Sequence, residues 1–252
     1  LRVDWSKPLF IAIKAMLTTM LAAGFRKAEA ALPNSEAVDG RRLRRSSVTW
    51  RIGGVDFADP TNEQLQQLAD GDYCILKPPL AKNDFLGLHF SWKPIYLVVD
   101  GDDSNAARAI AELLLAVPIA PEERDTTMLF CSSTAGAPIR HSLADSLLSH
   151  LLRAAFPSKD VSRWSWHSLR IGCACSLLKA GAPPHLIQAL CRWRSTASIE
   201  IYARLGAADY GRWVLRIQQQ TVDASTASNL PRFDYDNVIA GYYNQLDTAA
   251  DA

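Results

Sequence analysis

The chain has 252 residues, 48% hydrophobic and 21% charged, which suffices for a buried core and argues against a disordered or collagen-like protein. Its five cysteines form no CxxC pair, which favours a reduced, intracellular protein over a disulfide-rich secreted one. The net charge of +1 hides basic blocks at residues 1–51 (+6) and 151–216 (+7), separated by an acidic block at 52–150 (−8). These basic blocks either form one phosphate-binding face or are solvated separately, and charge alone does not decide between the two.

Two helices are predicted near the start of the chain. The first runs from Lys7 to Ala23 and ends at Gly24, a common helix stop. Its apolar stretch is interrupted by Lys14, which favours a buried helix over a membrane span. The second begins near Arg26 and reaches about Leu32, where Pro33 ends it.

A small antiparallel sheet is predicted next. The basic run from Arg41 to Arg51 leads from a loop into alternating, strand-favouring residues. Two further strands are predicted at 73–76 and 95–99, and the turn-rich segment 77–87 between them indicates an elaborated hairpin. Helices then dominate, and we place them at 104–116, 140–155, 167–180, 184–192, 196–203 and 207–219. The predicted fold class is therefore α+β, predominantly α-helical, with a small antiparallel sheet.

The residues that carry chemistry lie in the second basic block. His167 and Arg170 are three apart, so on a helix they share one face near its N-terminus, where anions bind. Trp193 and Tyr202 follow. Arginine suits a phosphate clamp, histidine a proton transfer and tyrosine a hydroxyl nucleophile. Each residue alone is common by chance, but the order and spacing together are much less so.

Three segments carry a family resemblance. The run Ala23-Gly24-Phe25-Arg26-Lys27-Ala28-Glu29 is similar to T-G-x-R-x-x-E, and residues 78–87 resemble an S-K-T/N-D-x-F-G turn that contains Lys82. The run His-Leu-Ile-Gln-Ala-Leu at 185–190 resembles an I-Q-x-L-L-G-H helix, with Trp193 in the His/Trp position. With the H-x-x-R box, residues 7–205 resemble the catalytic domain of the tyrosine recombinase (phage integrase) family.

The resemblance implies a set of catalytic residues: Arg26, Lys82, His167, Arg170, Trp193 and Tyr202. Tyr202 would attack a DNA phosphate, and Lys82 would protonate the leaving oxygen, although Lys77 and Lys93 flank the same hairpin. Tyr210 is a competing nucleophile but fits the spacing poorly. The sequence departs from the family at Ile171 and at Cys191-Arg192, which replaces the usual Leu-Gly.

The resemblance also implies a function and partners. We expect an enzyme that cleaves and rejoins double-stranded DNA through a 3′-phosphotyrosine, without a metal or other cofactor. It would be encoded by a mobile element and would act as a tetramer on two duplexes. Cys173 and Cys175 are expected to be buried apolar residues rather than metal ligands. No membrane partner is expected, and the compartment would be the nucleus in a eukaryote or the cytoplasm and nucleoid in a prokaryote. The expected DNA contacts are Arg41, Arg42, Arg44, Arg45, Arg192 and Arg194.

Two alternatives remain open. The chain is either an active recombinase or a domesticated DNA-binding protein that has lost catalysis, and a type IB topoisomerase-like or telomere-resolving enzyme would use the same chemistry without strand exchange. We assign residues 1–220 to the catalytic domain and 221–252 to a linker and tail. The tail carries an apolar, aromatic stripe between Phe233 and Leu246, which packs either on its own domain or on a neighbouring protomer.

Overall fold

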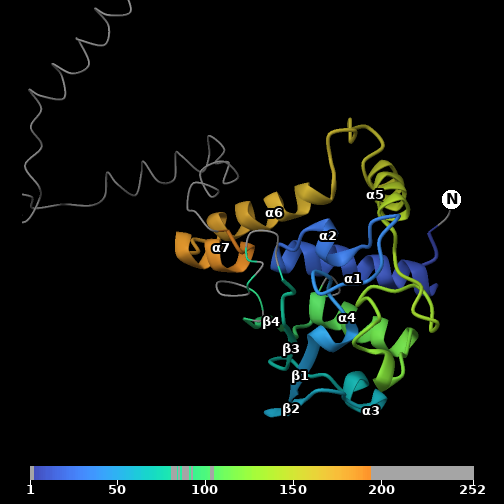
Figure 1. The fold of residues 1–252 in the computed structure, drawn as a ribbon. Helices are drawn as coiled ribbons and strands as arrows, with labels where there is room; N and C mark the ends of the chain where they lie inside the picture. Colours follow the sequence, from blue (N-terminus) through green and yellow to red (C-terminus); the bar gives the residue numbers. More distant parts are fainter. Residues whose placement is uncertain are drawn as a thin grey trace, which may run out of the picture. The chain divides into compact units, whose positions relative to one another are not determined.

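A computed structural model describes residues 3–80, 84, 86, 91, 93–102 and 105–193 of the chain (Figure 1). The helices are α1 (Pro8–Ala23), α2 (Lys27–Ala30), α3 (Asn62–Gln66), α4 (Ala106–Ala116), α5 (His141–Ala155), α6 (Trp166–Lys179) and α7 (Pro184–Cys191). The strands β1 (Val48–Ile52), β2 (Val55–Phe57), β3 (Tyr73–Leu76) and β4 (Ile95–Val98) form an antiparallel sheet in the order β2-β1-β3-β4. The predicted fold class, mainly helical with a small antiparallel sheet, is confirmed.

Helix α1 lies in the main hydrophobic core and packs against α4 and α6. Its core-facing side chains, such as Ile13, Met16 and Met20, are fully buried. Lys14 stays partly exposed and forms an ion pair with Glu112 of α4, with 2.9 Å between Nζ and Oε2. The apolar stretch is therefore a buried helix, as predicted, and none of the described helices is long and apolar enough to cross a membrane.

Gly24 ends α1 with a left-handed backbone, as its place in the sequence predicts. Its φ is 57° and its ψ is 33°. A Cβ at this position would lie 3.3 Å from Cys191 Sγ and 3.6 Å from Cys173 Sγ. The glycine therefore turns the chain sharply after α1 and lets this turn approach α6 and α7.

We expect Gly24→Ala to destabilise the protein by more than the roughly 1–2 kcal/mol that a left-handed backbone costs an L-residue, because crowding against Cys191 adds to it. Gly53→Ala is the matched control: Gly53 has a φ of 56° and nothing within 4 Å of its would-be Cβ. Urea unfolding of both variants measures the difference. Equal losses at the two positions would contradict the close approach at Gly24.

The sheet contains one strand that the sequence prediction missed. Gly53 and Gly54 both have positive φ and connect β1 to β2, with Ile52 paired to Val55. A two-residue loop of glycines between strand-favouring residues is a recognised hairpin signal, so β2 could have been predicted. The short helix α3 was missed too, although its N-cap Thr61 accepts a hydrogen bond from the Gln64 amide at 3.3 Å. The predicted strand at 73–76 is confirmed.

The helices that form the site follow the prediction closely, with one exception. α5, α6 and α7 begin or end within one residue of the predicted bounds. The second predicted helix is shorter, because Ala31 is extended and Leu32 instead forms a β-bridge with Arg140, just before α5. The expected helices at 196–203 and 207–219 and the tail 221–252 lie outside the described residues.

Candidate active site

Three of the six expected catalytic residues line one cavity. Arg26 lies just before α2, whereas His167 and Arg170 lie in the first turns of α6. The cavity has a volume of about 490 Å³. Its lining consists of Phe25, Arg26, Lys27, Ala28, His141, Asp145, Ser165, Trp166, His167 and Arg170. The structure therefore brings together one arginine from the first basic block and a histidine and an arginine from the second.

Local interactions place Arg26 at the rim of this cavity. Its backbone amide donates to Glu29 Oε2 at 2.7 Å, and its Nη1 donates to Glu29 Oε1 at 3.1 Å. Glu29 thus satisfies an otherwise unpaired amide at the start of α2 and holds the guanidinium at the same time. The Arg26 side chain is 33% exposed, so its remaining donors can meet a ligand.

Glu29 is a buried carboxylate shared by two arginines. Besides Arg26, it accepts a hydrogen bond from Arg192 Nη2 at 2.8 Å. Burial by itself would raise the pKa of Glu29, but Arg192, Arg26, the Arg26 amide and Arg170 together lower it below its ordinary value of 4.5. Glu29 is therefore ionised at neutral pH and compensates part of the positive charge at the site.

Because the pKa of Glu29 is lowered in the folded protein, its stabilising contribution is complete above pH 4.5 and is lost as the pH falls through the folded value. We expect Glu29→Gln to cost about 3–5 kcal/mol at neutral pH, because it leaves buried guanidinium groups uncompensated. This cost should shrink below pH 4.5. Urea unfolding across this range measures it, with Glu112→Gln in the exposed pair as control; a pH-independent cost would contradict the ionised Glu29.

Arg170 lies deeper than Arg26 and is only 3% exposed. Its Nη1 donates to the Gly24 carbonyl and its Nη2 to the Cys191 carbonyl, which uses two of the five N–H donors of a guanidinium. Burial, followed by the charges of Arg26 and Arg192, lowers the pKa of Arg170 to about 10. The side chain thus remains a cation at neutral pH, held rigidly between the ends of α1 and α7.

His167 is exposed at the N-terminal turn of α6. Part of the imidazole ring is nevertheless shielded from water. This partial burial, followed by the charges of Arg170 and Arg26, lowers the pKa of His167 below its ordinary value. The neutral imidazole therefore predominates at neutral pH, and it can accept a proton. This protonation state suits the role expected from the sequence.

Trp193 is placed beside Arg170 rather than in the cavity lining. It is 5% exposed, and the Arg170 Cζ lies 5.5 Å from its ring centroid. Its other neighbours in a small hydrophobic cluster include Cys173, Ile187 and Cys191. Trp193 therefore packs against the Arg170 guanidinium from within this hydrophobic cluster. Lys82, Tyr202 and Arg194 lie outside the described residues.

The cavity lining includes three ionisable residues that sequence reasoning did not assign to the site: Lys27, His141 and Asp145. Lys27 Nζ lies 2.9 Å from Asp145 Oδ2, which connects α2 to α5. Burial, followed by the nearby Lys27, lowers the pKa of His141. No sequence motif links α2 to α5, so only the three-dimensional structure identifies this contribution.

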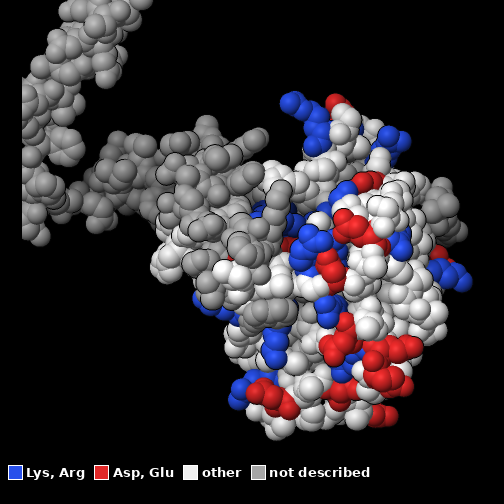
Figure 2. Space-filling view, viewed as in Figure 1, with Lys and Arg blue, Asp and Glu red and all other residues white. Residues whose placement is uncertain are grey.

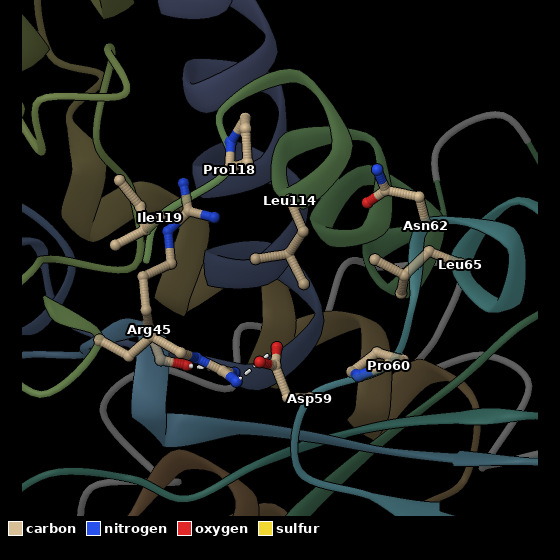
Figure 3. Close-up of a pocket in the computed structure, with 9 residues that line it drawn as sticks. Arg45, Asp59, Pro60, Asn62, Leu65, Leu114, Pro118 and Ile119 are labelled. Atoms are coloured by element: carbon tan, nitrogen blue, oxygen red, sulfur yellow. Dashed lines mark hydrogen bonds and ion pairs between the residues drawn. The ribbon is translucent and has the colours of Figure 1, made fainter. Parts of the chain in front are cut away.

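Three of the arginines expected to contact DNA are buried rather than on the surface: Arg42, Arg45 and Arg192 are 6%, 1% and 2% exposed. Arg42 donates to the Ala28 carbonyl at 2.7 Å and pairs with Glu36. Arg45 donates to Cys131 Sγ at 3.2 Å. Figure 3 shows the Arg45 side chain beside Leu114, Pro118 and Ile119, at a cavity of about 150 Å³. The guanidinium groups of these arginines form hydrogen bonds and ion pairs within the protein, and their side chains are almost fully buried.

Arg41 and Arg44 differ from these three. The Arg41 side chain is 59% exposed and pairs with Asp39 at 2.7 Å, and Arg44 is partly exposed. On the face shown in Figure 2, acidic side chains gather at the lower right, where α3 and the loops near it lie in Figure 1. The acidic middle block of the sequence thus contributes a surface at a distance from α6.

Comparisons with known proteins agree with this architecture. Residues 100–208 match the model of the Phage integrase family. The fold is similar to that of the XerH site-specific recombinase in a post-cleavage complex with palindromic difH substrate (TM-score 0.54, 13% identity, covering 87% of this chain and 48% of that one). It is also similar to XerA recombinase (TM-score 0.51, 18% identity, covering 88% of this chain and 64% of that one).

This chain therefore spans less than two thirds of either recombinase chain. No curated protein matches it in sequence. The identities to the solved structures are low, so the structural likeness concerns the fold, whereas the family match rests on the sequence of residues 100–208. Residues 100–208 therefore match the phage integrase family in sequence, and the chain has a fold similar to that of two solved tyrosine recombinases.

Proposed function

We propose that this protein is a site-specific DNA recombinase that cleaves and rejoins strands through a 3′-phosphotyrosine. The observation that carries the proposal is the cavity in which Arg26, His167 and Arg170 meet. Two guanidinium groups beside a neutral imidazole suit a phosphodiester, because they stabilise the charge that develops on its non-bridging oxygens while the imidazole takes up a proton. The match of residues 100–208 to the phage integrase family supports DNA cleavage and rejoining in general.

In the proposed mechanism, Tyr202 attacks the scissile phosphate and displaces the 5′-oxygen of the DNA. His167 takes up the phenolic proton, Lys82 gives a proton to the leaving oxygen, and Arg26 and Arg170 hold the phosphate. The covalent bond to tyrosine conserves the energy of the phosphodiester, so attack by a 5′-hydroxyl reverses the step. The roles of Lys82 and Tyr202 rest on the sequence resemblance, whereas those of the other three residues are supported by their shared cavity.

DNA is the proposed partner, with Arg41 and Arg44 as surface contacts. The XerH structure named above is a complex with its difH substrate. We further propose that the protein acts as a tetramer on two duplexes and comes from a mobile element. An assay with a nicked suicide duplex tests the activity: covalent trapping supports an enzyme, whereas retardation of the duplex without trapping would favour a DNA-binding protein without catalysis.

The acidic tail is proposed to connect protomers. Deleting residues 221–252 is expected to leave covalent cleavage at a single site intact but to reduce synapsis and completed strand exchange. The polar segment 221–229, expected from the sequence to be a linker, is nine residues long and spans up to about 30 Å when extended, which is enough to reach a neighbouring protomer. Cleavage and recombination assays on the same DNA sites separate the two effects. A truncated protein that recombines as well as the full chain would show that the tail has no role in assembly.

A further inference from the structure

Arg192 has an unusual backbone conformation. Its φ is 53° and its ψ is 50°, and among the described residues it is the only non-glycine with a positive φ. This conformation is unfavourable for side chains with a Cβ, and the family usually has glycine here. The chain therefore accepts backbone strain in order to keep a side chain at this position.

The side chain points into the protein and contacts the turn after α1. Arg192 Nη1 donates to the Ala23 carbonyl at 3.1 Å, and Nη2 lies 3.4 Å from the Gly24 carbonyl. Its Cζ lies 4.1 Å from the ring centroid of Phe25. One guanidinium thus contacts three consecutive residues directly before Arg26, a geometry that the planar arginine fork allows and a lysine does not.

The same guanidinium is linked to both arginines of the cavity. Its ion pair with Glu29 is 2.8 Å long and nearly fully buried, and Glu29 holds the amide and the guanidinium of Arg26. The Gly24 carbonyl near Arg192 also accepts a hydrogen bond from Arg170. Arg192 itself does not belong to the cavity lining, so any effect on a bound phosphate passes through Arg26 and Arg170.

We propose that Arg192 is a positioning residue that fixes Arg26 and Arg170 in the geometry needed for DNA cleavage. This role rests on the proposed function. The buried guanidinium of Arg192 connects the end of α7 to the turn after α1 and to Glu29 of α2. Such preorganisation affects the rate of the chemical step more than DNA affinity, because small displacements of a charge-stabilising group weaken it mainly in the transition state.

The test compares wild type, Arg192→Gly and Arg192→Lys on a nicked suicide duplex, measuring the cleavage rate at saturating DNA, the Kd and the thermal midpoint. Glycine adopts the left-handed backbone of position 192 readily, so Arg192→Gly removes the guanidinium without adding backbone strain. We expect this variant to cleave DNA about 10²-fold more slowly than wild type, with a nearly unchanged Kd. Arg192→Lys retains the charge beside Glu29 and should recover part of the rate. Arg108→Ala, which removes an arginine from an exposed ion pair with Asp70, is the control and should cleave at the wild-type rate.

These measurements distinguish failure of the positioning role from failure of the proposed function. Wild-type cleavage by Arg192→Gly would overturn the positioning role and leave the proposed function intact. A wild-type protein that forms no adduct would overturn the proposed function and this role with it. If Arg192→Gly does not fold, Arg192→Lys carries the test. It should then cleave more slowly than wild type at equal Kd and with an intact thermal transition, and an unchanged rate would overturn the proposal.

Discussion

The Tyr202→Phe variant is expected to form no covalent adduct with DNA while still binding it. Only the phenolic oxygen is removed, so contacts that depend on charge and shape persist. Loss of a nucleophile typically costs on the order of 10⁶-fold in rate. The measurement uses an end-labelled, nicked suicide duplex, with denaturing gels for the adduct and native gels for binding.

Tyr210→Phe is the matched control for this result. Tyr210 is the other tyrosine in the same stretch of sequence, and its variant should form the adduct at the wild-type rate. An adduct formed by Tyr202→Phe but not by Tyr210→Phe would move the nucleophile to Tyr210. The pair of variants therefore identifies the nucleophile by its position.

Replacing Arg170 should have the second-largest effect on cleavage. In the structure, its guanidinium lines the cavity and donates to the carbonyls of both Gly24 and Cys191. We expect Arg170→Ala to lower the cleavage rate by about 10²–10³-fold or more, as is typical when one preorganised donor is lost. Arg170→Lys should also be severely impaired, though less so, because an ammonium group cannot donate to both carbonyls and a phosphate in one plane.

Single-turnover cleavage at saturating DNA measures both Arg170 variants, and thermal unfolding verifies that each is folded. Arg108→Lys is the control, because it makes the same exchange in an exposed arginine that pairs with Asp70. A wild-type cleavage rate for Arg170→Lys would contradict the assignment of Arg170 to the phosphate clamp.

The sequence predicted the elements whose signals are local. Gly24 ends α1, Pro184 begins α7, and a short run of consecutive apolar residues forms β3. Each of these signals depends on the preferences of a few neighbouring residues. The H-x-x-R spacing predicted that His167 and Arg170 lie near the N-terminus of one helix, and the structure places both there in α6. The short strand β2 was missed although its two glycines carried a local signal.

The sequence did not reveal which arginines are buried. Arg192 and Glu29 are 163 residues apart, and nothing near either residue indicates that they form an ion pair. Arg45 and Cys131 are likewise 86 residues apart. A run of basic residues at 41–45 therefore predicted a DNA-contacting surface, whereas Arg42 and Arg45 point into the interior. Which charged residues pair over such distances depends on the packing of the whole fold. These pairs therefore cannot be predicted from the spacing of residues along the chain.

If the protein is the proposed recombinase, one of its tyrosines becomes covalently bonded to DNA during cleavage. Mass spectrometry of the protease-digested covalent complex tests it most directly, because it locates the residue that carries the nucleotide remnant. The account predicts a modification on Tyr202 and its absence from the Arg170→Ala sample at the same reaction time. A remnant on Tyr210 or on another residue, or no covalent complex with cleavable DNA, would contradict it.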